Sequence, residues 1–504
     1  MIEEIEVKRH PTLDDYAALA HLSEAVAELR REAARTAPAL GGRTLWMVNS
    51  TARGGGVAEM LPRDVALLEE LGVRTRWLVI STHNSEFFAL TKRIHNLIHD
   101  SGDAAFSAEE RALYDGVSRE LAAELRARIA PDDVLVVHDP QPAGAGALVK
   151  AQSGVVAVWR CHIGLDVHTT ATQAAWSFLE PYVTRYDHVV FSAPEYVPGA
   201  LADKTSIISP SIDPFTHKNR DLSTHKIVGI LADARLIPGY GPVLAPPFAV
   251  PATRLQADGS QRCATEPEDI GLLFRPIVTQ VSRWDRLKGW RPLLDGFVLL
   301  KRRLAERAPP PDDRVRRTLE LVRLVLAGPD PASIQDDPEA VQVFEELCKA
   351  YRSLEPELQR DIALLSLPMA SLKENALMVN VLQRCSTIVV QNSLQEGFGL
   401  TATEAMWKRI AVVASPACGL RQQIRPGIDG KMFSSAENRG EIADVLEALL
   451  SNPHEREALG RNAQRRVHDE FLIFSALRRW LTLLAAVVTP PGSAAAVAST
   501  PTPP

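Results

Sequence analysis

Two glutamates and two glycines stand close together in the segment Glu396-Gly-Phe-Gly-Leu-Thr-Ala-Thr-Glu404. A buried strand is predicted just before it, at 387–391, and a helix at about 401–408. Glycines at such a strand-to-helix turn let backbone N–H groups point at a bound sugar or phosphate. We expect Glu404 in the first helical turn, where its carboxylate can accept hydrogen bonds from ribose hydroxyl groups. The segment therefore predicts a sugar or phosphate site.

A structural explanation of Glu404 competes with this hypothesis. Thr401-Ala-Thr-Glu404 has the spacing of a capping box, in which the glutamate satisfies backbone amides at the start of a helix. A capping box does not explain why Glu396 and the two glycines are present in the same segment. Both interpretations of Glu404 stay open from the sequence alone.

Two cations, Arg283 and Lys288, follow the strand predicted at 277–282. Placed five positions apart around a turn, they can hold one diphosphate, the arginine through its planar fork and the lysine as a point charge. The alternative is an exposed basic loop with a salt bridge to Asp285. The spacing fits either interpretation.

The three glycines Gly54-Gly55-Gly56 lie between a strand predicted at 45–49 and a helical run that starts at Val57. Such a turn lets the backbone approach a ligand, and the helix N-terminus attracts negative charge. The turn matches neither a Walker loop nor the Gly-x-Gly-x-x-Gly fingerprint. It therefore predicts close approach to an anion, with a flexible turn as the alternative.

The elements that carry these residues form two series of short buried strands separated by helices. Their nearly continuous apolar character is typical of parallel strands covered on both faces. The first series has strands at 44–49, 73–80, 134–138, 155–160 and 188–191 and helices at about 57–70, 85–100, 107–130 and 172–184. The second has strands at 277–282, 321–327, 362–367, 387–391, 410–414 and 431–434 and helices at about 290–307, 338–352, 373–384 and 401–408. The predicted fold class is α/β, with two Rossmann-like doubly wound domains facing a central cleft.

The same patterns predict domain boundaries. Residues 219–274 are rich in turn-forming residues, which predicts an interdomain insertion. Within it, Asp258-Gly259 can form the turn of a β-hairpin. Residues 471–488 are interrupted by two arginines and predict an amphipathic helix on another surface. The expected parts are an N-terminal segment at 1–40, a first domain at 41–218, the insertion at 219–274, a second domain at 275–455, a helix returning to the first domain at 456–488 and a disordered tail at 489–504.

The composition narrows the class of protein. The 504 residues include 56 Lys plus Arg against 62 Asp plus Glu, so the basic excess of a dedicated nucleic-acid binder is missing. The five cysteines are widely spaced without a Cys-x-x-Cys pair, which fits a reducing cytoplasm. No stretch of about 20 apolar residues is present, so we expect no membrane span.

Several motifs together resemble known enzymes. The Glu396-x7-Glu404 spacing, with Arg283 and Lys288 upstream, resembles the donor half of retaining glycosyltransferases of family 4, which have the GT-B fold. The similarity covers most of residues 40–220 and 277–475. The motifs of the first half that resemble trehalose glycosyltransferring synthases, and the related retaining trehalose phosphorylases, are Asn49-Ser-Thr-Ala-Arg-Gly-Gly-Gly-Val-Ala-Glu59, His138-Asp-Pro-Gln-Pro142, Trp159-Arg-Cys-His-Ile163 and Pro210-Ser-Ile-Asp-Pro214.

The resemblance implies a nucleoside diphosphate glucose as the donor. Arg283 and Lys288 match the pair that neutralises the diphosphate as the leaving group develops charge. Glu396 matches the glutamate beside the donor sugar, and Glu404 matches the ribose-binding glutamate. The other implied donor contacts are made by the backbone of Phe398, Gly399 and Leu400 and by the glycines Gly55 and Gly56.

The first domain would supply the remaining site residues. His162 matches a histidine near the donor sugar and completes the catalytic set of Glu396, Arg283 and Lys288. Asp139 and Arg160 are implied as acceptor-binding residues. One departure is the segment Pro416-Ala-Cys-Gly-Leu420, which stands where relatives have a Gly-Gly turn near the donor sugar.

No metal and no other cofactor is expected, because cations and helix N-termini do what a divalent ion does in other glycosyltransferases. The acidic pairs Asp132-Asp133, Asp312-Asp313 and Asp336-Asp337 are predicted to lie in turns or at helix starts. A front-face displacement, in which the leaving phosphate takes the acceptor proton, fits the absence of an obvious nucleophile.

The predicted function is transfer of glucose from a nucleoside diphosphate glucose to glucose, with retention of configuration, to form α,α-trehalose. The alternatives are a retaining trehalose phosphorylase, a family 4 enzyme with another small sugar acceptor and a non-catalytic sugar-nucleotide sensor. The expected partners are the nucleotide sugar and glucose or trehalose, without nucleic acid or membrane, and a homodimer is compatible with them. We expect the protein in the cytoplasm.

Overall fold

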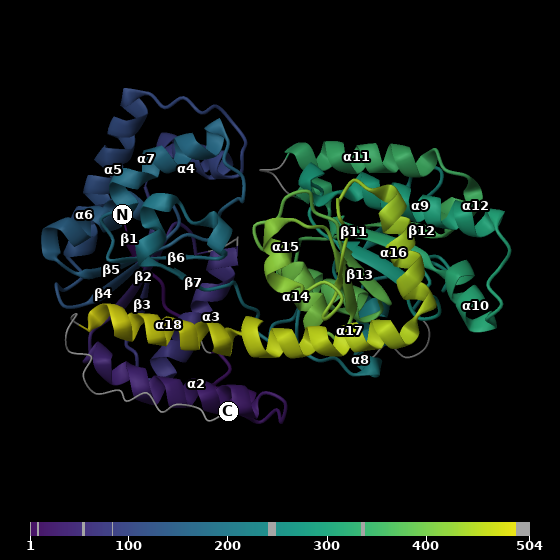
Figure 1. Cartoon of the computed structure of the whole chain (residues 1–504), viewed down its shortest axis with the longest axis horizontal. Coiled ribbons are helices and arrows are strands. Elements are labelled where there is room, and N and C mark those ends of the chain that lie inside the picture. Colours follow the sequence, from purple (N-terminus) through teal and green to yellow (C-terminus); the bar gives the residue numbers. More distant parts are fainter. Residues whose placement is uncertain are drawn as a thin grey trace. The chain divides into compact units, whose positions relative to one another are not determined.

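The structure is a computed structural model that describes residues 2–7, 10–52, 56–82, 84–239, 248–333 and 338–489. The chain forms two compact units (Figure 1). Unit 1 holds the chain up to Ser211 and again from Ile473, and unit 2 is Ile212–Leu472. Each unit is built on its own sheet.

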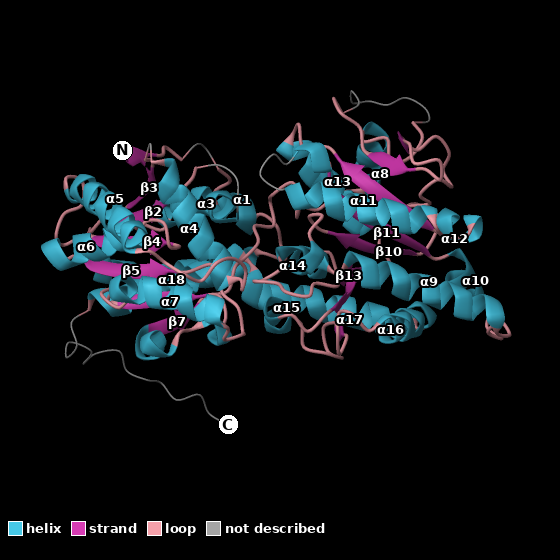
Figure 2. Ribbon diagram, turned by 90° about the horizontal axis from the view of Figure 1, so that it is seen from above, coloured by secondary structure: helices cyan, strands magenta, loops and turns pink. Residues whose placement is uncertain are grey.

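The described part of unit 1 contains a sheet with the strand order β1-β3-β2-β4-β5-β6-β7. All neighbours pair in parallel except β1, which runs antiparallel to β3. Helices cover both faces (Figure 2), which explains why every residue of β4 is buried. The strands are β1 (Ile2–Glu4), β2 (Leu45–Asn49), β3 (Thr75–Ile80), β4 (Val134–His138), β5 (Val156–Arg160), β6 (His188–Phe191) and β7 (Thr205–Ile207).

The α-helices of unit 1 confirm most of the predicted helical stretches. Helix α6 (Ala143–Ser153) was not predicted, because its first residues are alanines and glycines without an apolar periodicity. Its glycines have a packing reason: a Cβ on Gly144 would lie 2.4 Å from Ser118 Oγ on α5. The others are α1 (Leu13–Ala17), α2 (Ser23–Thr36), α3 (Gly56–Glu70), α4 (Ser85–Ile98), α5 (Ala108–Arg126), α7 (Thr170–Val183) and α18 (Ile473–Val488).

The strand order of unit 1 locates its ligand-binding edge. After β2 the chain adds β3 on one side and then crosses to add β4 on the other side of β2. In open α/β sheets, ligands bind at the carboxyl ends of the strands where the order reverses in this way. The loops that follow β2 and β4 therefore flank the expected site of unit 1.

The sheet in the described part of unit 2 has the order β15-β14-β13-β10-β11-β12-β8-β9. Its parallel strands run from β10 to β15, and the order reverses between β10 and β13, which pair in parallel. The loops after these two strands flank the corresponding edge of unit 2. The strands are β8 (Thr253–Leu255), β9 (Gln261–Arg262), β10 (Ile277–Val281), β11 (Arg323–Pro329), β12 (Ile362–Leu367), β13 (Ile388–Gln391), β14 (Ala411–Ala414) and β15 (Lys431–Met432).

Apolar side chains pack on both faces of this sheet. Alternate residues of one strand point to opposite faces, and Leu324 and Val325 on β11 accordingly belong to different core clusters. The covering α-helices are α8 (Thr224–Asp233), α9 (Trp290–Glu306), α10 (Asp313–Leu321), α11 (Pro338–Arg352), α12 (Pro356–Arg360), α13 (Leu372–Arg384), α14 (Leu400–Trp407), α15 (Cys418–Gln423), α16 (Arg439–Ser451) and α17 (Pro453–Arg466).

The segment expected as an interdomain insertion, 219–274, lies within unit 2. Its strand β8 pairs antiparallel with β12, and Leu231 of its helix α8 joins a core cluster of that unit. The predicted hairpin turn is confirmed, since β8 and β9 pair around Gly259, which has φ +86°. Residues 240–247 lie outside the described part of the chain.

The amphipathic helix predicted at the C-terminal end is confirmed as α18. It packs on α2 and buries Leu477, Leu481 and Leu484. Arg478 is partly exposed and pairs with Glu28 on α2. Helix α17, predicted to belong with it, packs instead against β14 in unit 2. Residues 490–504 lie outside the described part of the chain.

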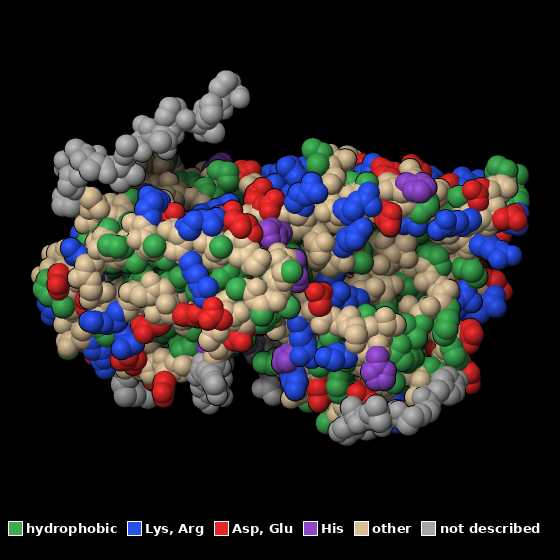
Figure 3. Space-filling view, turned by 90° about the horizontal axis from the view of Figure 1, so that it is seen from below, with side chains coloured by type: hydrophobic (Ala, Val, Ile, Leu, Met, Phe, Trp, Pro, Cys, Tyr) green, Lys and Arg blue, Asp and Glu red, His purple; other side chains and the backbone are tan. Residues whose placement is uncertain are grey.

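Within the described residues, no helix is both long enough and apolar enough to cross a membrane. On the face in Figure 3, Lys and Arg side chains are interspersed with Asp and Glu. That mixture follows from a composition with nearly equal numbers of the two kinds of charge.

Candidate active site

An ion pair lies where the strand order of unit 2 reverses. Lys288 Nζ is 2.8 Å from Glu396 Oε2, and each side chain is 13% exposed. Lys288 ends the short 3-10 helix η4 (Arg286–Lys288) after β10, whereas Glu396 follows β13. The structure thus brings together two of the predicted site residues, which are 108 positions apart in the chain.

The turn that carries Lys288 is held against the loop after β13. Gln280 Nε2 donates to the Lys288 carbonyl (2.8 Å), and its Oε1 accepts from the Asn392 backbone N–H (2.9 Å). Gly289 has φ +59°, and a Cβ there would lie 1.9 Å from the Asn392 carbonyl oxygen. Only glycine fits this close approach. The backbone at Lys288 is therefore held in place by the Gln280 side chain and by the close approach of Gly289 to Asn392.

Arg283 lies in the same loop but extends into solvent. Its side chain is 63% exposed, and its Nη2 is 3.7 Å from Asp285 Oδ2. The contact with Asp285 that we expected as an alternative is thus present, at a distance longer than a hydrogen bond. Diphosphate binding by Arg283 stays a prediction.

The Glu396 loop owes its shape to glycines and to the loop that follows β14. Gly399 has φ +87°, and the Gly419 N–H donates to the Glu396 carbonyl (3.0 Å). A Cβ on Gly419 would lie 2.4 Å from the Phe398 Cα. Gln423 donates to the Phe398 carbonyl and to the Gly419 carbonyl. The segment 416–420 therefore packs directly on the glycine-rich loop.

The capping-box explanation of Glu404 is wrong. Helix α14 begins at Leu400, and its N-cap is Gly399, which makes no side-chain cap. Thr401 is therefore not a cap residue, and Glu404 is the fifth helical residue, beyond the expected first turn. The left-handed backbone of Gly399 lets the helix begin two residues earlier than a Thr401 cap would.

Glu404 is buried, at 6% exposure, and has a buried neighbour that the sequence did not indicate. Lys408 Nζ donates to the Glu404 backbone carbonyl (3.1 Å). Burial lowers the pKa of Lys408 to about 7, and the nearby Glu404 carboxylate acts in the opposite direction. The Glu-x3-Lys spacing, which places both residues on one helix face, is the signal that could have identified this lysine.

In unit 1, two histidines meet at the ends of neighbouring strands. His138 Nδ1 on β4 is 2.9 Å from His162 Nε2 after β5, and the rings are nearly parallel, 12° apart, at a centroid distance of 5.3 Å. Of the two, only His162 had been predicted as a site residue. The end of β4 at the order reversal was the available signal for His138.

Asp139 and Arg160 lie beside this pair. Asp139 has φ +64°, unusual for a residue with a side chain, and its Oδ1 accepts the His162 backbone N–H (2.8 Å). Arg160 is only 2% exposed, and its Nη2 donates to Ser192 Oγ (3.2 Å). Its Nη1 and His138 Nε2 are buried without a partner among the described residues. The site therefore retains unpaired hydrogen-bonding groups.

Burial dominates the electrostatics of this site. It lowers the pKa of His138 to about 3 and that of His162 well below its usual value, and the Arg160 charge adds to both effects. Burial also raises the pKa of Asp139 to about 6, although the His162 N–H bond and Arg160 oppose the rise. The two imidazoles are thus neutral at neutral pH, so one donates to the other.

The remaining predicted residues have structural roles or lie outside the described chain. Asp132 and Asp133 lie in the turn before β4, where the Asp133 N–H donates to the Ala130 carbonyl, and Asp312 is the N-cap of α10, so the predicted turn and helix start are confirmed. Gly56 begins α3, whereas Gly55 and Asp336-Asp337 lie outside the described residues. Among the described residues, no group of three His, Cys, Asp or Glu side chains is arranged to hold a metal ion.

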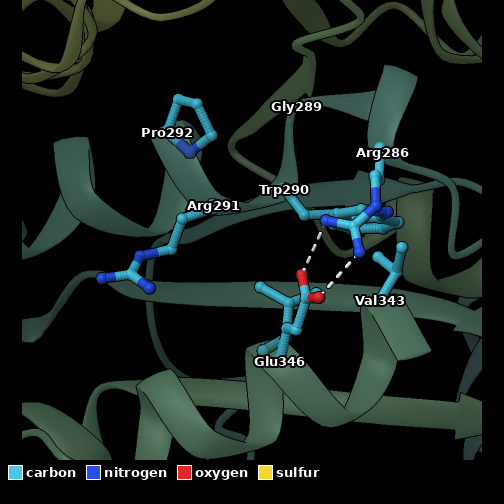
Figure 4. Close-up of a pocket in the computed structure, with 8 residues that line it drawn as sticks. Arg286, Gly289, Trp290, Arg291, Pro292, Val343 and Glu346 are labelled. Carbon is cyan, nitrogen blue, oxygen red and sulfur yellow. Dashed lines mark hydrogen bonds and ion pairs between the residues drawn. The ribbon is translucent and has the colours of Figure 1, made fainter. Parts of the chain in front are cut away.

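A pocket of about 180 Å³ lies beside the Lys288 turn (Figure 4). Arg286 reaches across it to Glu346 on α11, with Nη1 and Nη2 at 2.9 and 2.7 Å from the two carboxylate oxygens. Trp290 and Val343 form part of the apolar wall. The bidentate pair ties η4 to α11 and so adds to the fixed position of Lys288.

Comparison with known proteins gives consistent results along the chain. Residues 47–198 match a family model described as trehalose synthase, N-terminal domain, and residues 371–466 match glycosyl transferases group 1. A trehalose synthase of Pyrococcus horikoshii is 32% identical over 94% of this chain and 95% of its own length. A trehalose phosphorylase of Pleurotus pulmonarius is 25% identical over 86% of this chain and 56% of its own length.

Solved structures share the fold at lower sequence identity. An α,α-trehalose 6-phosphate synthase from Burkholderia multivorans superimposes with a TM-score of 0.59 at 19% identity, covering 89% of this chain and 97% of that one. This likeness confirms the predicted fold class, GT-B with two Rossmann-like domains.

Proposed function

Since this chain belongs to the trehalose synthase family of glycosyltransferases, we propose that it transfers glucose from a nucleoside diphosphate glucose to glucose and forms α,α-trehalose with retention of configuration. The observation that carries the proposal is the Lys288–Glu396 pair at the edge where Rossmann-like sheets bind ligands. A glycine-rich turn and a helix start adjoin this pair, as a sugar and a phosphate require.

The donor is held by unit 2 in this proposal. Lys288 has three N–H donors, so it can hold Glu396 and still donate to a phosphate oxygen. Arg283, exposed in the same loop, adds its planar fork, and the two charges stabilise the leaving diphosphate. Glu396 accepts a hydrogen bond from a hydroxyl group of the donor sugar, and Glu404 accepts from the ribose.

The acceptor glucose is held by unit 1. The Asp139 carboxylate and the buried Arg160 offer an acceptor and donors for hydroxyl groups of the acceptor sugar, and the neutral His162 is the catalytic histidine near the donor sugar. The acceptor oxygen attacks the anomeric carbon on the face that the diphosphate leaves, and the leaving phosphate oxygen takes the proton. We propose no metal ion and no other cofactor. We also infer a cytoplasmic protein that acts on small molecules and can form a homodimer.

A trehalose phosphorylase is the second candidate, because such an enzyme is also similar in sequence. The two reactions differ in whether a nucleoside diphosphate or phosphate accepts the glucose of trehalose. A buried carboxylate on α14 favours the nucleotide, since a phosphorylase has no ribose to bind.

The deciding experiment incubates the protein with trehalose and either ADP, GDP, UDP or inorganic phosphate, followed by product identification. We expect a nucleoside diphosphate glucose plus glucose from one of the nucleotides. Glucose 1-phosphate formed only with inorganic phosphate would establish the phosphorylase instead.

A further inference from the structure

A buried amide lies behind the Lys288–Glu396 pair. Gln391, the last residue of β13, is 1% exposed. Its Nε2 is 3.1 Å from Ser282 Oγ and 3.0 Å from Ser393 Oγ. Ser282 follows β10 and Ser393 follows β13, so this one amide joins the ends of the two strands between which the order reverses.

The direction of these hydrogen bonds follows from the chemistry of the groups. The Gln391 Nε2 has two hydrogens and only donates, so both serine oxygens accept from it. Ser393 then has its single hydrogen left, and its Oγ is 3.1 Å from Glu396 Oε2. A carboxylate only accepts, so Ser393 donates to Glu396. Glu396 Oε2 is thus held by Lys288 and by Ser393, and Gln391 Nε2 itself lies 3.5 Å from it, at the limit of hydrogen-bond distance, so the shorter path from Gln391 runs through Ser393.

The backbone around Ser393 is also restrained. Ser415 Oγ donates to the Ser393 carbonyl, and the Ser415 N–H donates to the Gln391 carbonyl (3.0 Å). The backbone carbonyls of Gln391 and Ser393 are therefore both tied to Ser415, the residue that follows β14. A rotation of the Gln391 amide would turn the Ser393 hydrogen toward Gln391 and away from Glu396.

We propose that Gln391 is a positioning residue of the donor site, acting through Ser393 on the Glu396 carboxylate. The proposal rests on the proposed function, in which Glu396 contacts the donor sugar. Gln391 holds Glu396 Oε2 in place beside Lys288, so that the carboxylate meets the sugar hydroxyl without reorganising. Neither Gln391 nor Ser393 contacts the reacting atoms.

A comparison with another glutamine of unit 2 supports this role. Gln359 donates through Nε2 to the backbone carbonyls of Tyr351, Arg352 and Leu354. Hydrogen bonds of this kind stabilise the conformation of a loop. Gln391 donates to two hydroxyl groups instead, and its buried Oε1 has no partner among the described residues. An unpaired buried acceptor lowers stability, so stability alone does not account for a glutamine at this position.

The test measures affinity for a nucleoside diphosphate glucose and for the same nucleoside diphosphate without glucose, by titration calorimetry. ADP, GDP and UDP and their glucose conjugates are screened on the wild-type protein first. In Gln391→Met and Ser393→Ala, we expect the sugar nucleotide to bind more weakly, by roughly tenfold, and the free nucleotide to bind within about twofold of wild type. The kcat for trehalose formation should fall by roughly tenfold to a hundredfold.

Two further variants separate positioning from folding. Ser393→Thr retains the hydroxyl group and should recover most of the lost activity, and Gln359→Met should lower stability without changing the ratio of the two affinities. Gln391 and Ser393 act through the same series of hydrogen bonds. The double variant Gln391→Met with Ser393→Ala should therefore bind the sugar nucleotide no more than about twofold more weakly than the weaker-binding single variant.

Three outcomes would overturn the inference: an unchanged affinity ratio in Gln391→Met, equal loss of both ligands, or fully additive losses in the double variant. The affinity ratio needs no acceptor sugar, so it tests Gln391 even if the acceptor is not glucose. Failure of the proposed function would appear separately, as absence of trehalose formation by the wild-type protein.

Discussion

Lys288 Nζ and Glu396 Oε2 are 2.8 Å apart, and both side chains are largely withdrawn from water. Each group lowers the cost of burying the other, and a part-buried charge left alone is destabilising. The same pair lies at the edge of the sheet where a ligand is expected. We therefore expect the pair to contribute both to folding and to ligand binding, so each variant needs a measurement of stability and one of activity.

Lys288→Met should lower turnover by at least about a hundredfold, because the leaving diphosphate loses a positive charge. It should also lower the free energy of unfolding by about 1–3 kcal/mol, because Glu396 is left without its partner. Urea unfolding and steady-state kinetics measure the two effects separately.

The matched control is Lys301→Met. Lys301 and Asp361 form an ion pair in the same unit at the same 2.8 Å, with side chains 11% and 19% exposed. We expect a similar loss of stability and unchanged turnover. Equal loss of turnover in both variants would show that stability alone explains the effect of Lys288.

Arg283→Ala should lower kcat strongly, by about tenfold or more, with a change in unfolding free energy of less than about 0.5 kcal/mol. The reason is that this side chain is 63% exposed and its contact with Asp285 is loose. Arg291→Ala is the control, since Arg291 is equally exposed and pairs with Asp295 on α9. Wild-type turnover in Arg283→Ala would remove this arginine from the mechanism.

Glu404→Gln should weaken binding of the nucleoside diphosphate by about tenfold, because a charged acceptor for the ribose is lost. Binding is the proper readout, since loss of charge beside the buried Lys408 also changes stability. Thr401→Ala should leave the melting temperature and binding unchanged, because Thr401 is not the N-cap of α14. A lowered melting temperature in both variants, with unchanged binding, would restore the capping box.

Asp139→Asn should change how stability depends on pH. The pKa of Asp139 is raised from 3.8 to about 6 in the folded protein, so between these values the folded state binds more protons than the unfolded state. Asp139 therefore contributes a loss of stability as pH rises from about 4 to about 6, by at most about 1.4 kcal/mol per pH unit, whereas the lowered pKa values of His138 and His162 contribute with the opposite sign in both proteins. The variant should lack this loss, as urea unfolding at pH 4, 5, 6 and 7 would show.

The backbone at this position provides the control. Asparagine tolerates the left-handed conformation of Asp139, whereas alanine pays a steric cost. Asp139→Ala should therefore be less stable than Asp139→Asn by about 1 kcal/mol at every pH. Parallel pH curves for wild type and Asp139→Asn would contradict the raised pKa.

Much of the fold could be predicted because the strands are short and almost wholly apolar. Strands β4 and β12 were predicted with the bounds that the structure shows, since Val134–His138 and Ile362–Leu367 are each buried throughout. Helix α6 was missed because Ala143-Gly-Ala-Gly has no apolar stripe, only small residues that let it approach α5. Apolar periodicity indicates a helix that is buried on one side, and it is uninformative for the first turns of α6, where residues 143–147 are all buried.

The candidate residues of the donor site could also be identified in the chain, because glycines, carboxylates and cations cluster next to strand ends. Their arrangement could not. Lys288 meets Glu396 only because β10 and β13 are neighbours in the sheet, and His138 meets His162 only because β4 and β5 are. The Gln391 amide reaches both serines only because the ends of β10 and β13 lie side by side. Residue types and spacing thus indicate which chemical groups are available. Which of these groups contact one another is decided by the strand order. The strand order depends on contacts between segments far apart in the chain.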